Sequence, residues 1–273
     1  MFITSFRYIK NLPITLRKLL VLHRFSVFLD EATPDDLYKS LLAWRLFKRE
    51  YGYLRSLKEN QCVNAAGEPI PWYTYPAIEQ LRLWDFKDCD ILEYGSGNST
   101  KWWAARAKTV TSIESSKLWY ETVFKSKPDN CQMILSEVDS DVINPDQIQK
   151  YIEVIDNLGM YDIIIVDSFS KGGARKKCAE KALQHLKPGG LLIVDNSDWL
   201  PNTCKLLRNQ GFLEIDFSGL GPLNSHAETT SLFFKKDFKI RPLSNDHPGY
   251  ATGGLKLHKD SGDSRLARDI PLS

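Results

Sequence analysis

The chain has 273 residues, enough for one large domain or for one domain with extensions. A formal net charge of +2 argues against a whole-protein electrostatic footprint for nucleic acid, so no nucleic-acid partner is expected. Its five cysteines are scattered and odd in number, which excludes a disulfide framework and a zinc pattern and favours a cytoplasmic location.

Residues 1–68 are predicted to form a helical extension. The apolar run 19–22 is too short to span a bilayer. A basic amphipathic helix in residues 1–30 could contact a membrane surface, but packing of that helix on its own domain is favoured. Residues 33–36 (Thr-Pro-Asp-Asp) are a helix start signal, and the apolar stripe after them predicts helix to about Glu59.

Residues 69–236 alternate strands and helices, as an α/β domain does, after a turn-rich connector over 64–76. Strands are predicted near 90–94, 109–114, 131–135, 161–167 and 190–195, with helices near 98–107, 117–126, 146–157, 172–187 and 201–210. Two last strands, 211–217 and 231–235, are joined by a loop, which predicts an antiparallel pair. The tail 237–273 is rich in Pro, Gly, Asp and Ser and is expected to be irregular.

The most informative segment is 91–103, where an apolar strand end is followed by two glycines and then by small polar residues. Gly95 and Gly97 allow a tight turn and let a ligand approach the backbone. The polar residues 98–100 can cap the following helix and present N–H groups and hydroxyls to a ligand. A nucleotide-like cofactor at this strand-to-helix turn is the natural interpretation.

The neighbouring residues indicate which cofactor binds. Thr100 stands where the dinucleotide fingerprint needs a third glycine, so an NAD-type oxidoreductase is disfavoured. Glu93, just before the glycines, suits the α-ammonium group of S-adenosylmethionine. Glu114, at the end of the second strand, can hold two ribose hydroxyls. S-adenosylmethionine is therefore the predicted cofactor.

These motifs resemble those of class I S-adenosylmethionine-dependent methyltransferases. The resemblance lies in residues 93–100, Glu114, and the segments 161–167 and 186–195. More narrowly, the chain resembles a largely uncharacterised bacterial methyltransferase group in residues 71–76, 93–100, 195–197 and 229–234. The resemblance implies a methyltransferase domain over 69–236, built on a doubly wound, mostly parallel, seven-stranded Rossmann-like sheet with an antiparallel last strand.

Polar residues follow several of the predicted strands, and ligands of open α/β sheets bind outside the carboxyl ends of the strands. Aromatic residues near the glycine turn could cover the cofactor or stack on its adenine. The predicted cofactor-binding residues are Glu93, Gly95, Ser96, Gly97, Asn98, Ser99, Thr100, Glu114, Ser115, Trp119, Ser136, Glu137, Asp167 and Tyr75.

A second group of polar residues resembles the divalent-metal triad of catechol-type O-methyltransferases. Asp167, Asp195 and Asn196 would form a half-shell of hard oxygens for Mg²⁺, which could bind an acceptor hydroxyl and lower its pKa. The alternative gives Asp195 and Asn196 a structural role and makes His226, in the loop before the last strand, the general base. The predicted catalytic residues are Asp167, Asp195 and His226.

The predicted function is methyl transfer to a hydroxyl of a small molecule or a glycan. The Asn/Asp-Pro-Pro-aromatic signature of enzymes that methylate amino groups of nucleic-acid bases is absent after Val194. Residues 1–68 are expected to help cover the acceptor. A non-catalytic S-adenosylmethionine-binding protein, or a membrane-peripheral partner protein, is the alternative from a different class.

Overall fold

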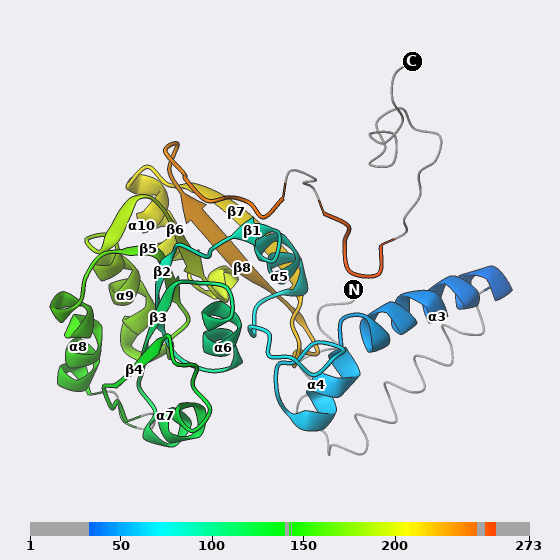
Figure 1. Cartoon of the computed structure of the whole chain (residues 1–273), viewed down its shortest axis with the longest axis horizontal. Coiled ribbons are helices and arrows are strands. Elements are labelled where there is room, and N and C mark those ends of the chain that lie inside the picture. The colour runs from blue at the N-terminus through cyan, green and yellow to red at the C-terminus, as the bar shows by residue number, and fades with distance from the viewer. Residues whose placement is uncertain (1–32, 140–141, 143, 245–248, 255–273) are drawn as a thin grey trace, which may run out of the picture. The chain divides into compact units, whose positions relative to one another are not determined.

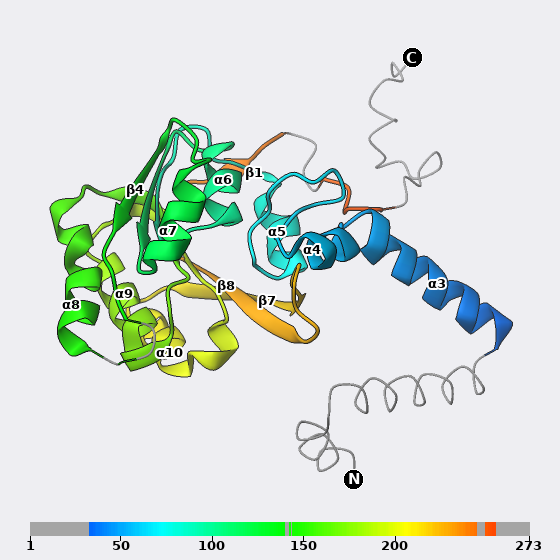
Figure 2. The same cartoon turned by 90° about the horizontal axis from the view of Figure 1, so that it is seen from below.

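The computed structural model describes residues 33–139, 142, 144–244 and 249–254 (Figures 1 and 2). The contacts divide the chain into two compact units, with the division between Phe47 and Lys48. Residues 48–68, which the sequence assigns to the helical extension, therefore belong to the same unit as the sheet. The expectation of membrane contact falls on residues 1–30, which lie outside the described ranges.

Helix α3, Pro34–Arg49, starts where the sequence predicts. The N–H and the hydroxyl of Thr33 both donate to Asp36 Oδ2, at 3.0 and 2.6 Å, which caps the helix. The helix does not continue to Glu59, because Gly52 has a φ of +76° and separates it from α4, Tyr53–Glu59. A β-carbon at Gly52 would lie 2.3 Å from the carbonyl carbon of Asn64, so only glycine fits this bend.

A seven-stranded sheet with the order β4-β3-β2-β5-β6-β8-β7 forms the centre of the second unit. The strands β2 to β6 run parallel, and β8 is antiparallel to both β6 and β7. The predicted doubly wound, mostly parallel sheet with an antiparallel final pair is confirmed. Its strands are β2 (Asp90–Tyr94), β3 (Thr109–Glu114), β4 (Cys131–Leu135), β5 (Tyr161–Val166), β6 (Leu186–Val194), β7 (Leu213–Leu220) and β8 (Ala227–Phe234).

Helices cover both faces of this sheet (Figures 1 and 2). Because both faces are covered, residues 163–166 of β5 and 191–194 of β6 have no exposed surface, which explains their continuous apolar runs. One face carries α8 (Pro145–Glu153), α9 (Ala174–Ala182) and α10 (Pro201–Asn209), and the other carries α5 (Tyr75–Leu81), α6 (Asn98–Ala104) and α7 (Lys117–Phe124).

Most α-helices of this unit are shorter than predicted, and short 3-10 turns lie next to three of them, at Val154–Asn157, Lys171–Gly173 and Ser197–Trp199. The predicted helix 146–157 includes the first of these turns, and the predicted helix 172–187 extends past the end of α9 into β6. Helix α5 lies at the end of the expected connector. Its start follows from Thr74, whose hydroxyl accepts a hydrogen bond from the Ala77 N–H. None of the helices in the described ranges is both long enough and apolar enough to cross a membrane.

Part of the tail is ordered against the second unit. Strand β9, Arg241–Pro242, pairs antiparallel with β1, Trp84–Asp85, in a separate two-stranded sheet. Further along, the N–H of Thr252 donates to Glu79 Oε2 at 3.0 Å. The rest of the described tail is irregular, as the composition predicts.

Candidate functional site

The glycine turn between β2 and α6 is held by backbone and hydroxyl contacts. Gly95 has a φ of +118°, in the region that favours glycine, and its N–H donates to the Ile113 carbonyl at 2.9 Å. The N–H of Gly97 donates to the hydroxyl of Thr100 at 2.9 Å. The turn is therefore fixed both to the neighbouring strand β3 and to its own helix.

Glu93 lies directly under this turn and is almost fully buried, with 1% of its surface exposed. The Thr100 hydroxyl donates to Glu93 Oε2 at 2.6 Å. Burial raises the pKa of the Glu93 carboxyl to about 8, against the opposing effect of hydrogen bonds from Ser99 and Thr100. A cationic group placed beside Glu93 would favour its ionised form, as expected for a residue that faces an ammonium group.

Glu114 lies on the other side of the turn, at the end of β3. Its Oε1 accepts the N–H groups of Ser115 and Ser116, each at 2.8 Å, and its Oε2 accepts the Ser96 hydroxyl at 2.6 Å. The indole N–H of Trp119 donates to the Ser96 carbonyl at 2.6 Å. The glycine turn is thus bracketed by two carboxyl groups, and each is hydrogen-bonded to a hydroxyl of the turn or of its helix.

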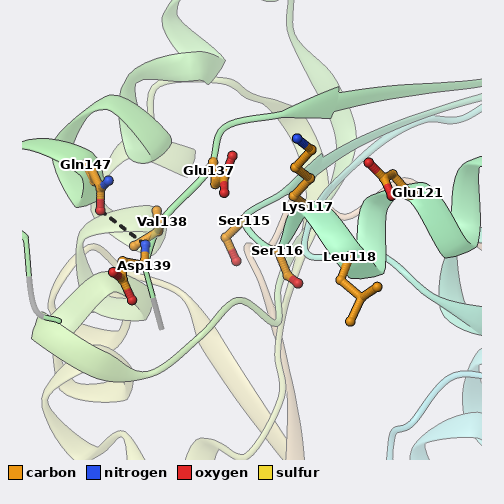
Figure 3. Close-up of a pocket in the computed structure, with 9 residues that line it drawn as sticks. All are labelled: Ser115, Ser116, Lys117, Leu118, Glu121, Glu137, Val138, Asp139 and Gln147. Atoms are coloured by element: carbon orange, nitrogen blue, oxygen red, sulfur yellow. Dashed lines mark hydrogen bonds between the residues drawn. The ribbon is translucent and has the colours of Figure 1, made fainter. Parts of the chain in front are cut away.

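A hollow of about 540 Å³ opens beside Glu114, between the start of α7 and the segment that follows β4 (Figure 3). Its volume is in the usual range for a small-molecule site. Two predicted cofactor residues line it, Ser115 and Glu137, whereas Glu93, Glu114 and the residues of the glycine turn do not. The lining residues are Ser115, Ser116, Lys117, Leu118, Glu121, Glu137, Val138, Asp139 and Gln147.

The segment before α5 lies against the glycine-turn helix. Asn98, a predicted cofactor residue, donates from Nδ2 to the carbonyl of Cys62 at 2.8 Å. The hydroxyl of Tyr53 donates to the Asn224 carbonyl at 2.9 Å.

Tyr75 is nearly buried, and its ring lies 4.8 Å from that of Tyr51, centroid to centroid, so its visible role is packing. Cofactor contact by Tyr75 stays a prediction.

Arg175, on α9, joins the ends of β5 and β6. Its Nη2 donates to Asp167 Oδ1 at 3.1 Å, and its Nη1 donates to the Asp195 carbonyl at 2.7 Å and to Asn196 Oδ1 at 2.9 Å. Its Nε donates to the Ser168 carbonyl. The three predicted metal ligands therefore do converge, as the strand-end argument expects, but they converge on a guanidinium group.

The two carboxyl groups at this edge differ in surroundings. Asp195 is buried, accepts the Thr230 hydroxyl at 2.7 Å, and has a pKa raised well above its ordinary value by burial and by the nearby Asp167. Burial also raises the pKa of Asp167, to about 6, while Arg175 opposes the rise. Asp167 is the more exposed of the two, at the end of β5 beside the glycine turn.

A further buried carboxyl at the same edge, that of Glu228, is not among the residues predicted from the sequence. It accepts Asn196 Nδ2 at 2.7 Å on one oxygen and Asn224 Nδ2 on the other. The Asn224 Oδ1 in turn accepts the indole N–H of Trp72 at 2.9 Å. The sequence signal that could have indicated Glu228 is the alternation along β8, where Glu228 and Thr230 are polar residues two positions apart and both are buried.

His226, the predicted base, is exposed in the turn between β7 and β8. A charge on its imidazole would lower the pKa of Glu228, which burial raises. His226 is therefore near Glu228, although no hydrogen bond joins it to Asp195 or to Asp167 among the described contacts.

The donor set does not fit Mg²⁺. Asn196 Oδ1 is engaged by Arg175, and the Asp195 carboxylate is directed to Thr230. A divalent ion at this place would also lie beside the positive charge of a guanidinium. Within the described ranges, no three His, Cys, Asp or Glu side chains are grouped so that they could hold a metal ion. These contacts do not support Mg²⁺ at Asp167, Asp195 and Asn196, where the structure has the guanidinium of Arg175.

Comparison with known proteins shows similarity in fold only. No protein-family model and no curated protein sequence matches the chain. Among solved structures, a precorrin-6y C5,15-methyltransferase from Geobacter metallireducens is 14% identical, with a TM-score of 0.44 over 59% of this chain and 87% of that one. A precorrin 8w decarboxylase from Methanobacterium thermoautotrophicum is 19% identical, with a TM-score of 0.43 over 65% and 97%.

A putative methyltransferase from Streptococcus mutans, solved with S-adenosylhomocysteine, is 17% identical, with a TM-score of 0.40 over 57% of this chain and 92% of that one. These values are too low for function to be transferred. The Rossmann-like fold follows from the strand order of the chain itself.

Proposed function

We propose that the chain binds S-adenosylmethionine across the carboxyl ends of β2, β3 and β4 and transfers its methyl group to a hydroxyl of a small molecule or a glycan. The observation that supports this best is the pair Glu93 and Glu114, one carboxyl on each side of the glycine turn. Glu93 suits the α-ammonium group of the cofactor, and Glu114 suits its two ribose hydroxyls. The hollow beside Ser115 and Glu137 would take the adenine.

S-adenosylmethionine, when bound, supplies a methyl group already activated on a sulfonium. The protein then has to place the acceptor oxygen in line with that methyl group and exclude water. Asp167 and Asp195, at the ends of β5 and β6, are the proposed groups on the acceptor side. His226 is the proposed base, since an exposed imidazole at the edge of the site can accept the proton of a hydroxyl near neutral pH.

Calorimetry tests cofactor choice, with S-adenosylhomocysteine and NADH titrated separately into the full chain. The proposal expects binding of S-adenosylhomocysteine alone, and binding of NADH alone would support an oxidoreductase instead. Turnover is then measured as S-adenosylhomocysteine release with hydroxylated small molecules and glycans, and with RNA as a comparison. Cofactor binding without turnover on any acceptor would favour the non-catalytic alternative.

A further inference from the structure

The acceptor edge holds a fixed positive charge that the sequence pattern does not reveal. Arg175 is largely buried, with 12% of its side chain exposed, and contacts Asp167, Asn196 and the Asp195 carbonyl. These are the three residues that would ligate Mg²⁺ in the resembled triad. The guanidinium therefore lies among these residues, against the Asp167 carboxylate, the Asn196 side chain and the backbone of Asp195, whose own carboxylate accepts from Thr230.

The geometry of Arg175 suits this position better than a lysine would. A guanidinium has five N–H donors in a rigid plane, and four are used here: one from Nε to the Ser168 carbonyl, two from Nη1 and one from Nη2. The second N–H of Nη2 has no acceptor among the hydrogen bonds of the described residues. It is available to one oxygen of a ligand.

Asn196 extends the arrangement toward the rest of the acceptor edge. It has a φ of +50°, a left-handed conformation that Asn tolerates better than most residues. In this conformation its Oδ1 accepts from Arg175 and its Nδ2 donates to Glu228. One guanidinium thus fixes the Asp167 carboxylate on one side and, through Asn196, the Glu228 carboxylate on the other.

We propose that Arg175 is the resident cation of the acceptor edge, a positioning residue that makes a divalent metal ion unnecessary there. It holds Asp167 and Asn196 in place and offers its remaining N–H to a single acceptor oxygen. The acceptor would be a compound that is bound through one oxygen atom. It would not need two adjacent hydroxyls, as an acceptor that chelates a metal does. The inference rests on the proposed function only for the statement that this edge faces the acceptor.

The first experiment uses Mn²⁺ as a probe for Mg²⁺, followed by electron paramagnetic resonance on the full chain with and without S-adenosylhomocysteine. The natural sequence is expected not to bind one Mn²⁺ per chain at a site that needs Asp195. One Mn²⁺ bound per chain, and lost in Asp195→Asn, would overturn the proposal. This measurement needs no acceptor, and its free-chain arm decides the metal question even if the cofactor proposal fails.

The second experiment measures S-adenosylhomocysteine affinity by calorimetry for Arg175→Ala, Arg175→Lys and the control Lys176→Ala. Lys176 is the next residue of α9 and makes only an exposed ion pair with Glu180. Arg175→Ala is expected to lose about tenfold or more in affinity, because Asp167, a predicted cofactor-binding residue, loses the group that holds it in place. A loss of this size is in the range of one hydrogen bond to a charged group, and Lys176→Ala is expected to lose none.

Chemical rescue separates positioning from a general loss of structure. Methylguanidinium at millimolar concentration is expected to restore affinity to Arg175→Ala, whereas Mg²⁺ is not, because the vacated space matches a planar donor group. Unchanged affinity in Arg175→Ala, or rescue by Mg²⁺, would overturn the proposal. If Arg175→Ala does not fold, Arg175→Lys decides: it should bind more weakly than the natural sequence, and equal affinity would contradict the role of the planar fork.

Discussion

The carbonyl oxygen of Asp167 lies 2.7 Å from the position that a β-carbon would take at Gly95. The two residues follow the adjacent parallel strands β2 and β5, and the N–H of Asp167 donates to the Tyr94 carbonyl at 3.1 Å. The glycine turn and the end of β5 are therefore packed backbone against backbone. No side chain fits at position 95, whatever its chemistry, without moving Asp167.

Gly95→Ala is expected to destabilise the protein more than an alanine at another left-handed glycine. Such positions cost about 1–3 kcal/mol for a residue other than glycine, and Gly95 adds the clash with Asp167. Gly211→Ala is the matched control, because Gly211 has a φ of +81° and nothing within 4 Å of its β-carbon position. Denaturant unfolding measures both, and equal losses would contradict the backbone contact.

The buried carboxyl of Glu93 should make the cofactor-free protein less stable as pH rises. Its folded pKa of about 8 is above the ordinary value of 4.5, so between these values the folded state keeps a proton that the unfolded chain has lost. The free energy of unfolding contributed by this group therefore falls from pH 4.5 to 8 and is constant above that window. Glu93→Gln should remove this slope, and an unchanged slope would contradict the assignment.

The same pKa makes a separate prediction for cofactor binding. At pH 7 the Glu93 carboxyl is mainly protonated, and an ammonium group beside it favours ionisation. Binding of S-adenosylhomocysteine should therefore release part of a proton, which calorimetry detects as an enthalpy that varies with the ionisation enthalpy of the buffer. Glu93→Gln should abolish that dependence, provided that the variant still binds. A buffer-independent enthalpy for the natural sequence would place the ammonium group elsewhere.

Glu114→Ala should lower the affinity for S-adenosylhomocysteine by about tenfold or more, which is about 1.4 kcal/mol of binding free energy. The reason is that the ribose hydroxyls lose a charged hydrogen-bond acceptor. Glu180→Ala is the control, since Glu180 lies on α9 and makes an exposed ion pair with Lys176. Circular dichroism should show that both variants are folded. Equal affinities for Glu114→Ala and the natural sequence would remove Glu114 from the cofactor site.

Truncation tests the expectation that the N-terminal segment helps to shape the site. A chain that begins at Lys48 keeps the second unit whole and should bind S-adenosylhomocysteine as the full chain does. A chain that begins at Gly67 loses the contacts of Cys62 with Asn98 and of Tyr53 with Asn224, and should be less stable and bind more weakly. If the Gly67 chain is folded and retains full acceptor turnover, residues 48–66 do not shape the site.

The order of strands and helices could be predicted from the sequence because it depends on local patterns. Residues 161–167 form a continuous apolar run, and the observed strand Tyr161–Val166 is buried on both faces. The glycine turn is likewise local, since Gly95 has the positive φ that the tight turn suggested. Glu93 and Glu114 could be predicted because Glu93 precedes the last residue of β2 and Glu114 is the last residue of β3, and parallel strands end at the same edge of the sheet.

The identity of the cation at the acceptor edge was decided only by the tertiary structure. Arg175 is one of several basic residues along 171–177, and nothing in their spacing distinguishes it from Lys176 or Lys177. Its partners lie 7 to 21 residues away, at the ends of two different strands. Periodicity determines which face of a helix is buried. The position of α9 relative to the ends of β5 and β6 determines which of its side chains reaches the ends of these strands. A pattern of Asp and Asn therefore predicts a cation site, and packing determines that a guanidinium fills it.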